Sequence, residues 1–389
     1  MKQPVSARWA LALSACAASV LFGSGSVLLG TCGNFTDVAG DVFCAFVLEL
    51  FTLGITTGTS PTTFDPSSNV NRLQMAAFVS RTVDAALTRA GRRAALNQFW
   101  TSKNPDSIQQ IPLGSPGVSV KSDGADLWVT NNSSTVARIR ASDGRLLETW
   151  TGAFNNWGVM VAPGRIFVTG SSNPGLLYRI NPAQTAGAVT TVASNLGIDP
   201  VAASFDGAKI LTANIGFSPG LGSVSIVTPG ATIPWSATTV TTGFSQPAGA
   251  LFDGTYFWVA DQALNALFKV SQAGAILQTV TVDIQPAAPI FDGANIWVPN
   301  RGSNSVTVVR ASTGTVLDTL TGNGLAFPQA AAFDGQRVLV TNGGGDFVSL
   351  WKAADLTTLG FVELPATSKG VCSDGINFWI VSGLNLARF

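Results

Sequence analysis

The chain has 389 residues, of which 46% are hydrophobic and 11% charged, so it can form a large core but is too poor in charge for a coiled coil or a charged disordered protein. Lys plus Arg number 22 and Asp plus Glu number 22, a balance that argues against nucleic acid as a partner. The sequence contains no histidine, which excludes Ser-His-Asp and Cys-His nucleophile pairs and histidine metal ligands.

The first 31 residues have the pattern of a secretory signal peptide. Lys2 and Arg8 precede an apolar stretch, residues 9–29, that carries no charge and is interrupted by Gly and Ser. A short basic segment followed by an apolar one predicts export. Two alternatives remain open: a retained membrane anchor, and a lipoprotein, because Leu13-Ser14-Ala15-Cys16 resembles a lipobox.

The other cysteines fit an exported protein. Cys32 and Cys44 are close in sequence, and an oxidising compartment favours a disulfide between them. Cys372 lies in an apolar strand pattern and is expected to be an inert buried thiol.

Residues 32–95 are predicted to form a small helical module. Asp41 is a candidate N-cap for a first helix, which Gly54 ends. Residues 58–68 are rich in Thr, Ser, Pro and Gly and predict a loop. Asn71 and Gln74 resemble a capping box that begins a second helix. The apolar face of the first helix is expected to contain Phe43, Phe46, Val47 and Leu50.

Several motifs of this module resemble the S-layer homology (SLH) domain. They are Phe35-Thr36-Asp37-Val38, Gly54-Ile55-Thr56-Thr57-Gly58, Phe64-Asp65-Pro66 and the segment 69–78. The resemblance implies attachment to cell-wall or envelope polysaccharide, with Arg72 at the position that contacts an anionic sugar group. From the residues alone, the alternative is that Asn71 and Gln74 cap a helix, that Arg72 is solvated, and that the module only caps the larger domain.

Residues 96–106 are predicted to be a linker, and residues 107–389 contain a repeat. An Asp-Gly pair follows an apolar strand six times, and Pro163-Gly164 has the same flanking pattern. The spacing of 39–47 residues is that of propeller blades. The seven copies begin their turns at Asp123, Pro163, Asp206, Asp253, Asp292, Asp334 and Asp374.

Each copy predicts four antiparallel strands, one blade of a β-propeller. The last copy is too short for its outermost strand, whereas the segment 108–113 before the first copy has the pattern of that strand. We therefore predict a mainly β fold: a seven-bladed propeller closed by an N-terminal strand. Trp128, Trp258, Trp297 and Trp379 recur at one strand position and are expected to pack between blades.

The array resembles the YVTN/NHL class of propellers, most clearly at Leu127-Trp128-Val129-Thr130-Asn131, Ile296-Trp297-Val298-Pro299-Asn300 and Val338-Leu339-Val340-Thr341-Asn342. The resemblance implies the fold but no particular activity, because propellers carry out many functions.

Two sets of loops are expected on one face of the propeller, around the mouth of its channel. The loops after the second strands contribute Asn131, Asn214, Asp261, Asn300, Arg301 and Asn342. The loops that lead into the first strands contribute Trp157, Asp199, Gln246, Gln285, Gln329 and Lys369. Such a polar ring is suited to hydrogen bonding with a polysaccharide or a protein. The alternative is that Asn and Asp occur there because they tolerate turn conformations.

The rival hypothesis is a secreted hydrolase. Lactonase-like propellers hold a divalent metal with Glu, Asp and Asn, but here the ends of the second strands offer Asp261 as the only carboxylate, which is too few for a Ca²⁺ site. We therefore predict no metal, no cofactor and no catalysis. The interpretation is an exported, envelope-associated bacterial binding or scaffold protein, whose partners are envelope polysaccharide and a protein or glycan ligand at the propeller face.

Overall fold

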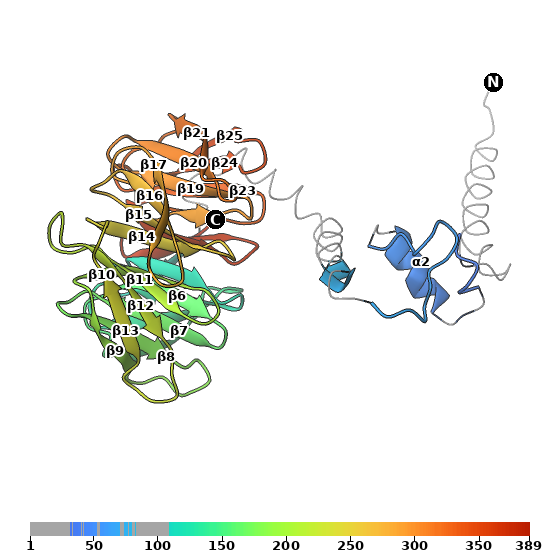
Figure 1. Cartoon of the computed structure of the whole chain (residues 1–389), viewed down its shortest axis with the longest axis horizontal. Coiled ribbons are helices and arrows are strands. Elements are labelled where there is room, and N and C mark those ends of the chain that lie inside the picture. The colour runs from blue at the N-terminus through green and yellow to red at the C-terminus, as the bar shows by residue number, and fades with distance from the viewer. Residues whose placement is uncertain are drawn as a thin grey trace, which may run out of the picture. The chain divides into compact units, whose positions relative to one another are not determined.

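The computed structural model describes residues 32, 34–39, 41, 43–52, 55–70, 74–76, 78–79, 82 and 109–389. The chain divides into two compact units, Met1–Ser102 and Lys103–Phe389. In Figure 1 the described residues of the first unit are blue, and those of the second run from teal to red. Six predictions lie outside the described residues: the signal peptide 1–31, the lipobox at Cys16, the helix end at Gly54, the capping residue Asn71, the contact residue Arg72 and the linker 96–106. Within the described part, no helix is long and apolar enough to cross a membrane.

The N-terminal unit contains helix α2 (Cys44–Thr52). The main-chain N–H of Phe43 donates to Oδ1 of Asp41 at 2.8 Å, so Asp41 caps the helix as predicted. Residues 74–76, 78–79 and 82 are also helical, where the second helix is expected.

The buried face of α2 agrees with the prediction only in part. Val47 is buried and Leu50 is half-buried, but Phe43 and Phe46 are 64% and 61% exposed. A disulfide joins Cys32 to Cys44, and because Cys44 is thereby held toward the core, the neighbours on its helical face turn inward with it. Cys32, Phe35, Val38 and Val47 form the core of the unit, with Cys44, Leu48 and Phe64 packed against it.

Asp37 holds the loop that follows α2. Its carboxylate accepts hydrogen bonds from the main-chain N–H groups of Phe64, at 2.9 Å, and Asp65, at 2.6 Å. These bonds favour the charged form and lower the pKa of Asp37. The first and third motifs of the SLH resemblance are therefore in direct contact.

The second unit contains seven four-stranded antiparallel sheets (Figure 1), as the repeat predicts. The first three blades are β2 (Ser119–Ser122), β3 (Asp126–Thr130), β4 (Thr135–Arg140) and β5 (Leu146–Thr151); β6 (Asn156–Ala162), β7 (Arg165–Gly170), β8 (Gly175–Ile180) and β9 (Thr190–Leu196); and β10 (Pro200–Phe205), β11 (Ile210–Asn214), β12 (Ser223–Thr228) and β13 (Ser236–Val240). The next three are β14 (Pro247–Phe252), β15 (Phe257–Asp261), β16 (Ala266–Val270) and β17 (Ile276–Thr281); β18 (Ile290–Phe291), β19 (Asn295–Asn300), β20 (Ser305–Arg310) and β21 (Thr315–Thr321); and β22 (Pro328–Phe333), β23 (Arg337–Asn342), β24 (Phe347–Lys352) and β25 (Thr358–Glu363).

The seventh blade closes the ring. It contains β26 (Ser368–Ser373), β27 (Phe378–Ser382) and β28 (Asn385–Arg388) from the C-terminus, and its outermost strand is β1 (Gln109–Pro112). Strand β1 pairs with β28 from Gln109↔Arg388 to Pro112↔Asn385. The predicted N-terminal closing strand is therefore present, and β28 has no open edge.

The recurring Asp and Trp residues form one structural unit in each of four blades. Oδ1 of Asp292 accepts hydrogen bonds from the main-chain N–H groups two and three residues further on, and Oδ2 accepts one from Nε1 of Trp297 at 2.8 Å. Trp128, Trp258 and Trp379 bond in the same way to Asp123, Asp253 and Asp374. All four Trp side chains are fully buried, and each lies in an apolar cluster with residues of a neighbouring blade. The prediction that they pack between blades is therefore confirmed.

In the two blades that have Leu at the Trp position, the aspartate Oδ2 has no indole as its hydrogen-bond donor. In the sixth blade, Nε of Arg337 replaces the indole and donates to Oδ2 of Asp334 at 2.8 Å. In the third blade, Oδ2 of Asp206 is buried and has no hydrogen-bond partner among the described residues. Asp206 therefore serves as a natural comparison for the aspartates that bind a tryptophan.

Apolar clusters fill the spaces between blades. One cluster joins the first and seventh blades and includes Ile111 of β1, Leu127 and Val129 of β3, and Trp379 and Leu386. The innermost strands approach one another so closely that small residues are required. A Cβ atom on Gly249 would lie 2.6 Å from Cδ of Pro289 in the next blade.

Candidate functional site

The two predicted sets of loops do meet on one face of the propeller. In six blades, a main-chain N–H just after the second strand donates to a carbonyl just before the first strand of the same blade. The donors are Ser171, Ile215, Gln262, Arg301, Gly343 and Gly383, and the acceptors are Asn155, Asp199, Gln246, Gln285, Phe327 and Thr367. Hydrogen bonds of the main chain therefore fix the loops of this face.

Four side chains of the predicted polar ring do not face the solvent. Asn214, Asp261, Asn300 and Asn342 are all fully buried. Nδ2 of Asn214 donates to the hydroxyls of Ser223 and Ser225 on the next strand. The expectation that these four residues form an accessible ring is wrong, because their polar groups bind their own blades.

The same pattern recurs at the other strand ends. Nδ2 of Asn300 donates to Ser305 and Thr307, and Nδ2 of Asn342 donates to Ser349. The carboxylate of Asp261 accepts from the main-chain N–H groups of Ser245, Gln246, Ala263 and Leu264. These side chains therefore stabilise the strand ends and loops of their own blades.

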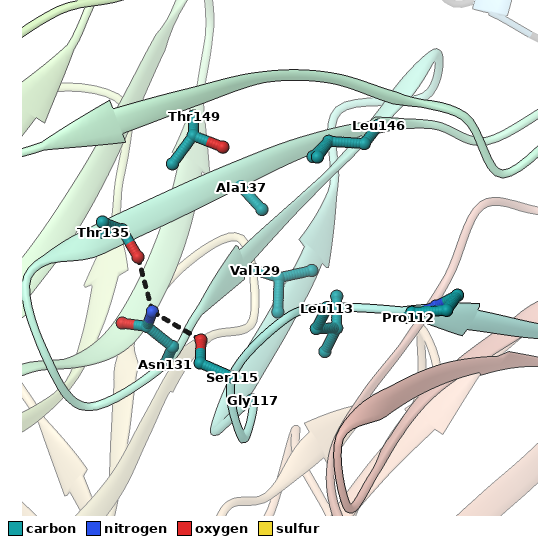
Figure 2. A pocket seen from close by; sticks show the side chains of 10 residues that line it. All are labelled: Pro112, Leu113, Ser115, Gly117, Val129, Asn131, Thr135, Ala137, Leu146 and Thr149. Carbon is teal, nitrogen blue, oxygen red and sulfur yellow. Dashed lines mark hydrogen bonds between the residues drawn. The ribbon is translucent and has the colours of Figure 1, made fainter.

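Asn131 faces a small pocket between the first blade and the segment that follows β1 (Figure 2). Its amide nitrogen donates to Oγ of Ser115 and Oγ1 of Thr135. The pocket has a volume of about 50 Å³ and its other walls include Leu113, Val129 and Ala137. Asn131 therefore connects the hairpin of its blade to the closing segment, and its amide does not line the central cavity.

Three predicted residues lie together at the propeller axis. Trp157, Arg301 and Lys369 line a cavity of about 310 Å³. The innermost strands of the blades, or the residues beside them, supply the rest of the wall, which is mostly Ala, Val and Gly. The cavity is the central channel of the propeller.

Lys121 also lines this cavity and was missed in the sequence analysis. It pairs with Trp128 across the first two strands of its blade, two residues before the Asp of the Asp-Gly pair. The corresponding positions in five other copies hold Ser204, Leu251, Ile290, Ala332 and Cys372. The signal that could have identified Lys121 is a lysine at a repeat position where these other copies have an apolar or small residue.

Cys372 lies beside this wall and is a free, buried thiol. Burial raises its pKa to about 12, so at neutral pH the thiol is protonated and a poor nucleophile. We expect iodoacetamide at pH 8 to leave Cys372 unmodified in the folded protein and to alkylate it after denaturation, as measured by peptide mapping. Alkylation of native Cys372 at the rate of the denatured protein would contradict this burial.

The N-terminal unit has a groove of its own. Its volume is about 310 Å³, and it lies between the loop residues 56–70 and the helical residues Gln74 and Phe78. Phe64, Asp65 and Val70 contribute to its wall. In the sequence, Arg72 lies between the groove residues Val70 and Gln74.

Among the described residues, no three His, Cys, Asp or Glu side chains lie close enough together to hold a metal ion. Asp199, on the loop face, accepts a hydrogen bond from Ser171, and Asp261 is occupied by main-chain donors.

Comparison with known proteins supports both units. Residues 34–76 match the family model of the S-layer homology domain. The chain therefore carries an S-layer homology domain followed by a seven-bladed β-propeller. The domain indicates association with the bacterial cell surface. A search of curated proteins found no match.

The propeller is similar to several solved structures. Virginiamycin B lyase from Staphylococcus aureus has a TM-score of 0.60 and 13% identity, covering 72% of this chain and 98% of that one. The WD40 propeller domain of Doa1 has a TM-score of 0.57 and 13% identity, covering 72% and 96%. The computationally designed Ika8 protein has a TM-score of 0.55 and 10% identity, covering 72% and 99%. At these identities the likeness concerns the fold alone.

Proposed function

We propose that the protein is exported and held to the bacterial envelope by its SLH domain, which binds cell-wall polysaccharide, while the propeller presents a binding site at the mouth of its central cavity. The SLH match at residues 34–76 carries this proposal. Export is supported by the basic and apolar N-terminal sequence and by the disulfide between Cys32 and Cys44.

The groove of the N-terminal unit supports polysaccharide attachment. Its wall combines the aromatic ring of Phe64 with polar Thr, Ser and Asn residues, a combination suited to a sugar. In the SLH resemblance, Arg72 contacts the anionic group of the glycan, and its sequence position is between the groove residues Val70 and Gln74. Because an isolated copy has no avidity from linked sites, we expect weak, salt-sensitive binding.

For the propeller we propose binding and not catalysis. The central cavity has no carboxylate among its lining residues, and the sequence has no histidine, so the wall offers neither a carboxylate nor an imidazole as a general acid or base. We further assign the blades to the YVTN/NHL type, supported by the Trp128, Trp297 and Leu339 strand motifs and the loops that follow them.

The substitution Arg72→Ala tests the attachment. We expect it to reduce co-sedimentation with purified cell-wall sacculi at least about fivefold, because a charge-assisted contact contributes about 1–3 kcal/mol, and to leave the melting temperature unchanged. Arg81→Ala, at the next arginine in the sequence, is the matched control. Equal pelleting of the two variants would exclude the proposed role of Arg72.

A further inference from the structure

The central cavity of the propeller has an unbalanced positive charge. Lys121, Arg301 and Lys369 line it, and its lining, all within the described part of the chain, includes no Asp or Glu. The chain as a whole is balanced, with 22 basic and 22 acidic residues. Withdrawing cations from bulk water without a counter-charge costs free energy. An anion in the cavity would therefore be stabilised by all three cationic side chains.

Arg301 has unused hydrogen-bonding capacity. Its main-chain N–H donates to the carbonyl of Gln285 at 2.9 Å, which fixes the backbone at the channel mouth. The guanidinium carbon lies 5.9 Å from the ring centroid of Phe327, and Nε is buried without a hydrogen-bond partner among the described residues. Burial lowers the pKa of Arg301, but an arginine stays charged at neutral pH. The side chain is therefore a cation with a free donor.

The two lysines come from neighbouring blades. Lys121 is on β2 and is partly buried, and burial lowers its pKa. Lys369 is exposed at the start of β26, and its carbonyl accepts a hydrogen bond from Oγ1 of Thr341 at 2.6 Å. Since Arg301 follows β19 in the fifth blade, positive groups enter the cavity from separate parts of the ring.

Aromatic surface accompanies the charges. Trp157 and Phe327 line the cavity and are 38% and 43% exposed. The carbonyl of Trp157 accepts a hydrogen bond from Oγ1 of Thr130 in the preceding blade at 2.5 Å. A threonine of the preceding blade therefore holds the main chain of Trp157, as it does for Lys369. Gln329 adds an amide to the lining. A ligand with an apolar ring face, hydroxyl groups and a negative charge would match all these groups.

We propose that the central cavity binds an acidic saccharide, with its carboxylate among Lys121, Arg301 and Lys369 and a sugar ring against Trp157 and Phe327. This assignment rests on the proposed function and names the class of ligand for the propeller.

Isothermal titration calorimetry of the whole protein tests the assignment, with trigalacturonate as the acidic probe, galactotriose as the neutral probe and inorganic phosphate as a simple anion. We expect trigalacturonate to bind and galactotriose not to bind. Binding should weaken at high salt, since the Debye length falls to about 3 Å at 1 M. No binding of trigalacturonate, or equal binding of the neutral sugar, would overturn the proposal. If phosphate binds and trigalacturonate does not, the assignment of a saccharide as the ligand is wrong.

Four variants locate the site. Arg301→Gln, Lys121→Met and Lys369→Gln should each weaken trigalacturonate binding at least about tenfold, or about 1.4 kcal/mol. Trp157→Ala should weaken the saccharide more than phosphate. Arg310→Gln and Lys352→Gln, at exposed positions outside the cavity, are the matched controls, and circular dichroism melting checks folding. Affinities equal to those of the controls in folded variants would place the binding elsewhere.

The outcomes also separate this inference from the proposed function. If the protein pellets with sacculi but does not bind trigalacturonate, envelope attachment stands and the cavity assignment fails. If trigalacturonate binds but Arg72→Ala pellets as the unchanged protein does, the cavity assignment stands and the attachment residue is wrong.

Discussion

Deletion of residues 107–114 is expected to unfold the propeller. The deletion removes β1, whose pairing with β28 completes the seventh blade, and the hydrogen bond from the N–H of Leu113 to the carbonyl of Leu384 at 2.9 Å. It also removes Ile111, which is buried between the first and seventh blades. Truncating one buried aliphatic residue costs about 2–5 kcal/mol, and an exposed β28 would add an edge open to aggregation.

Thermal unfolding followed by circular dichroism measures this effect. A deletion of the same length within the predicted linker, residues 96–103, is the matched control and should leave the melting temperature unchanged. Ile111→Ala should fall between the two, since it removes the side chain but keeps the strand. A normal melting transition after deletion of 107–114 would show that the ring does not depend on its closing strand.

Asp292→Ala is expected to destabilise the propeller by about 3 kcal/mol. The substitution removes two hydrogen bonds to main-chain N–H groups and leaves Nε1 of Trp297 buried without its acceptor. An unsatisfied buried donor alone costs about 1–3 kcal/mol. Urea denaturation of the variant and the unchanged protein gives the difference in the free energy of unfolding.

Asp206→Ala is the matched control for this prediction. Oδ1 of Asp206 accepts the same two main-chain bonds, but its Oδ2 has no partner among the described residues, and Leu211 occupies the Trp position. The loss should therefore be smaller than for Asp292→Ala by about 1–3 kcal/mol. Equal losses would show that the bond to the indole contributes nothing to stability.

The fold could be predicted from the sequence because its signals repeat. The Asp-Gly pairs, the recurring Trp and the short last copy indicated seven blades and the closing strand, and β1 lies where the segment 108–113 was expected. The buried face of α2 was predicted only in part, because helical spacing allows more than one apolar face. Val47 is buried, but Phe43 and Phe46 are exposed, and the buried face includes Cys44 of the disulfide.

The site was predicted less well, for a physical reason. Spacing places Asn214, Asn300 and Asn342 at the ends of second strands, but it does not show where their amides point. In the fold, hydroxyls on the next strand accept from those amides, so the amide nitrogens are bonded inside the blade. The cavity is instead lined by Trp157, Arg301 and Lys369. Their side chains do not make these bonds to hydroxyls of the next strand.

The central claim is that the SLH domain attaches the protein to the envelope. The most direct measurement is co-sedimentation with purified cell-wall sacculi, comparing residues 33–389 with residues 105–389. We expect the longer chain to pellet and the shorter one to stay in solution, because only the longer one contains the SLH domain at residues 34–76. Equal pelleting of the two chains, or pelleting of neither, would contradict the claim.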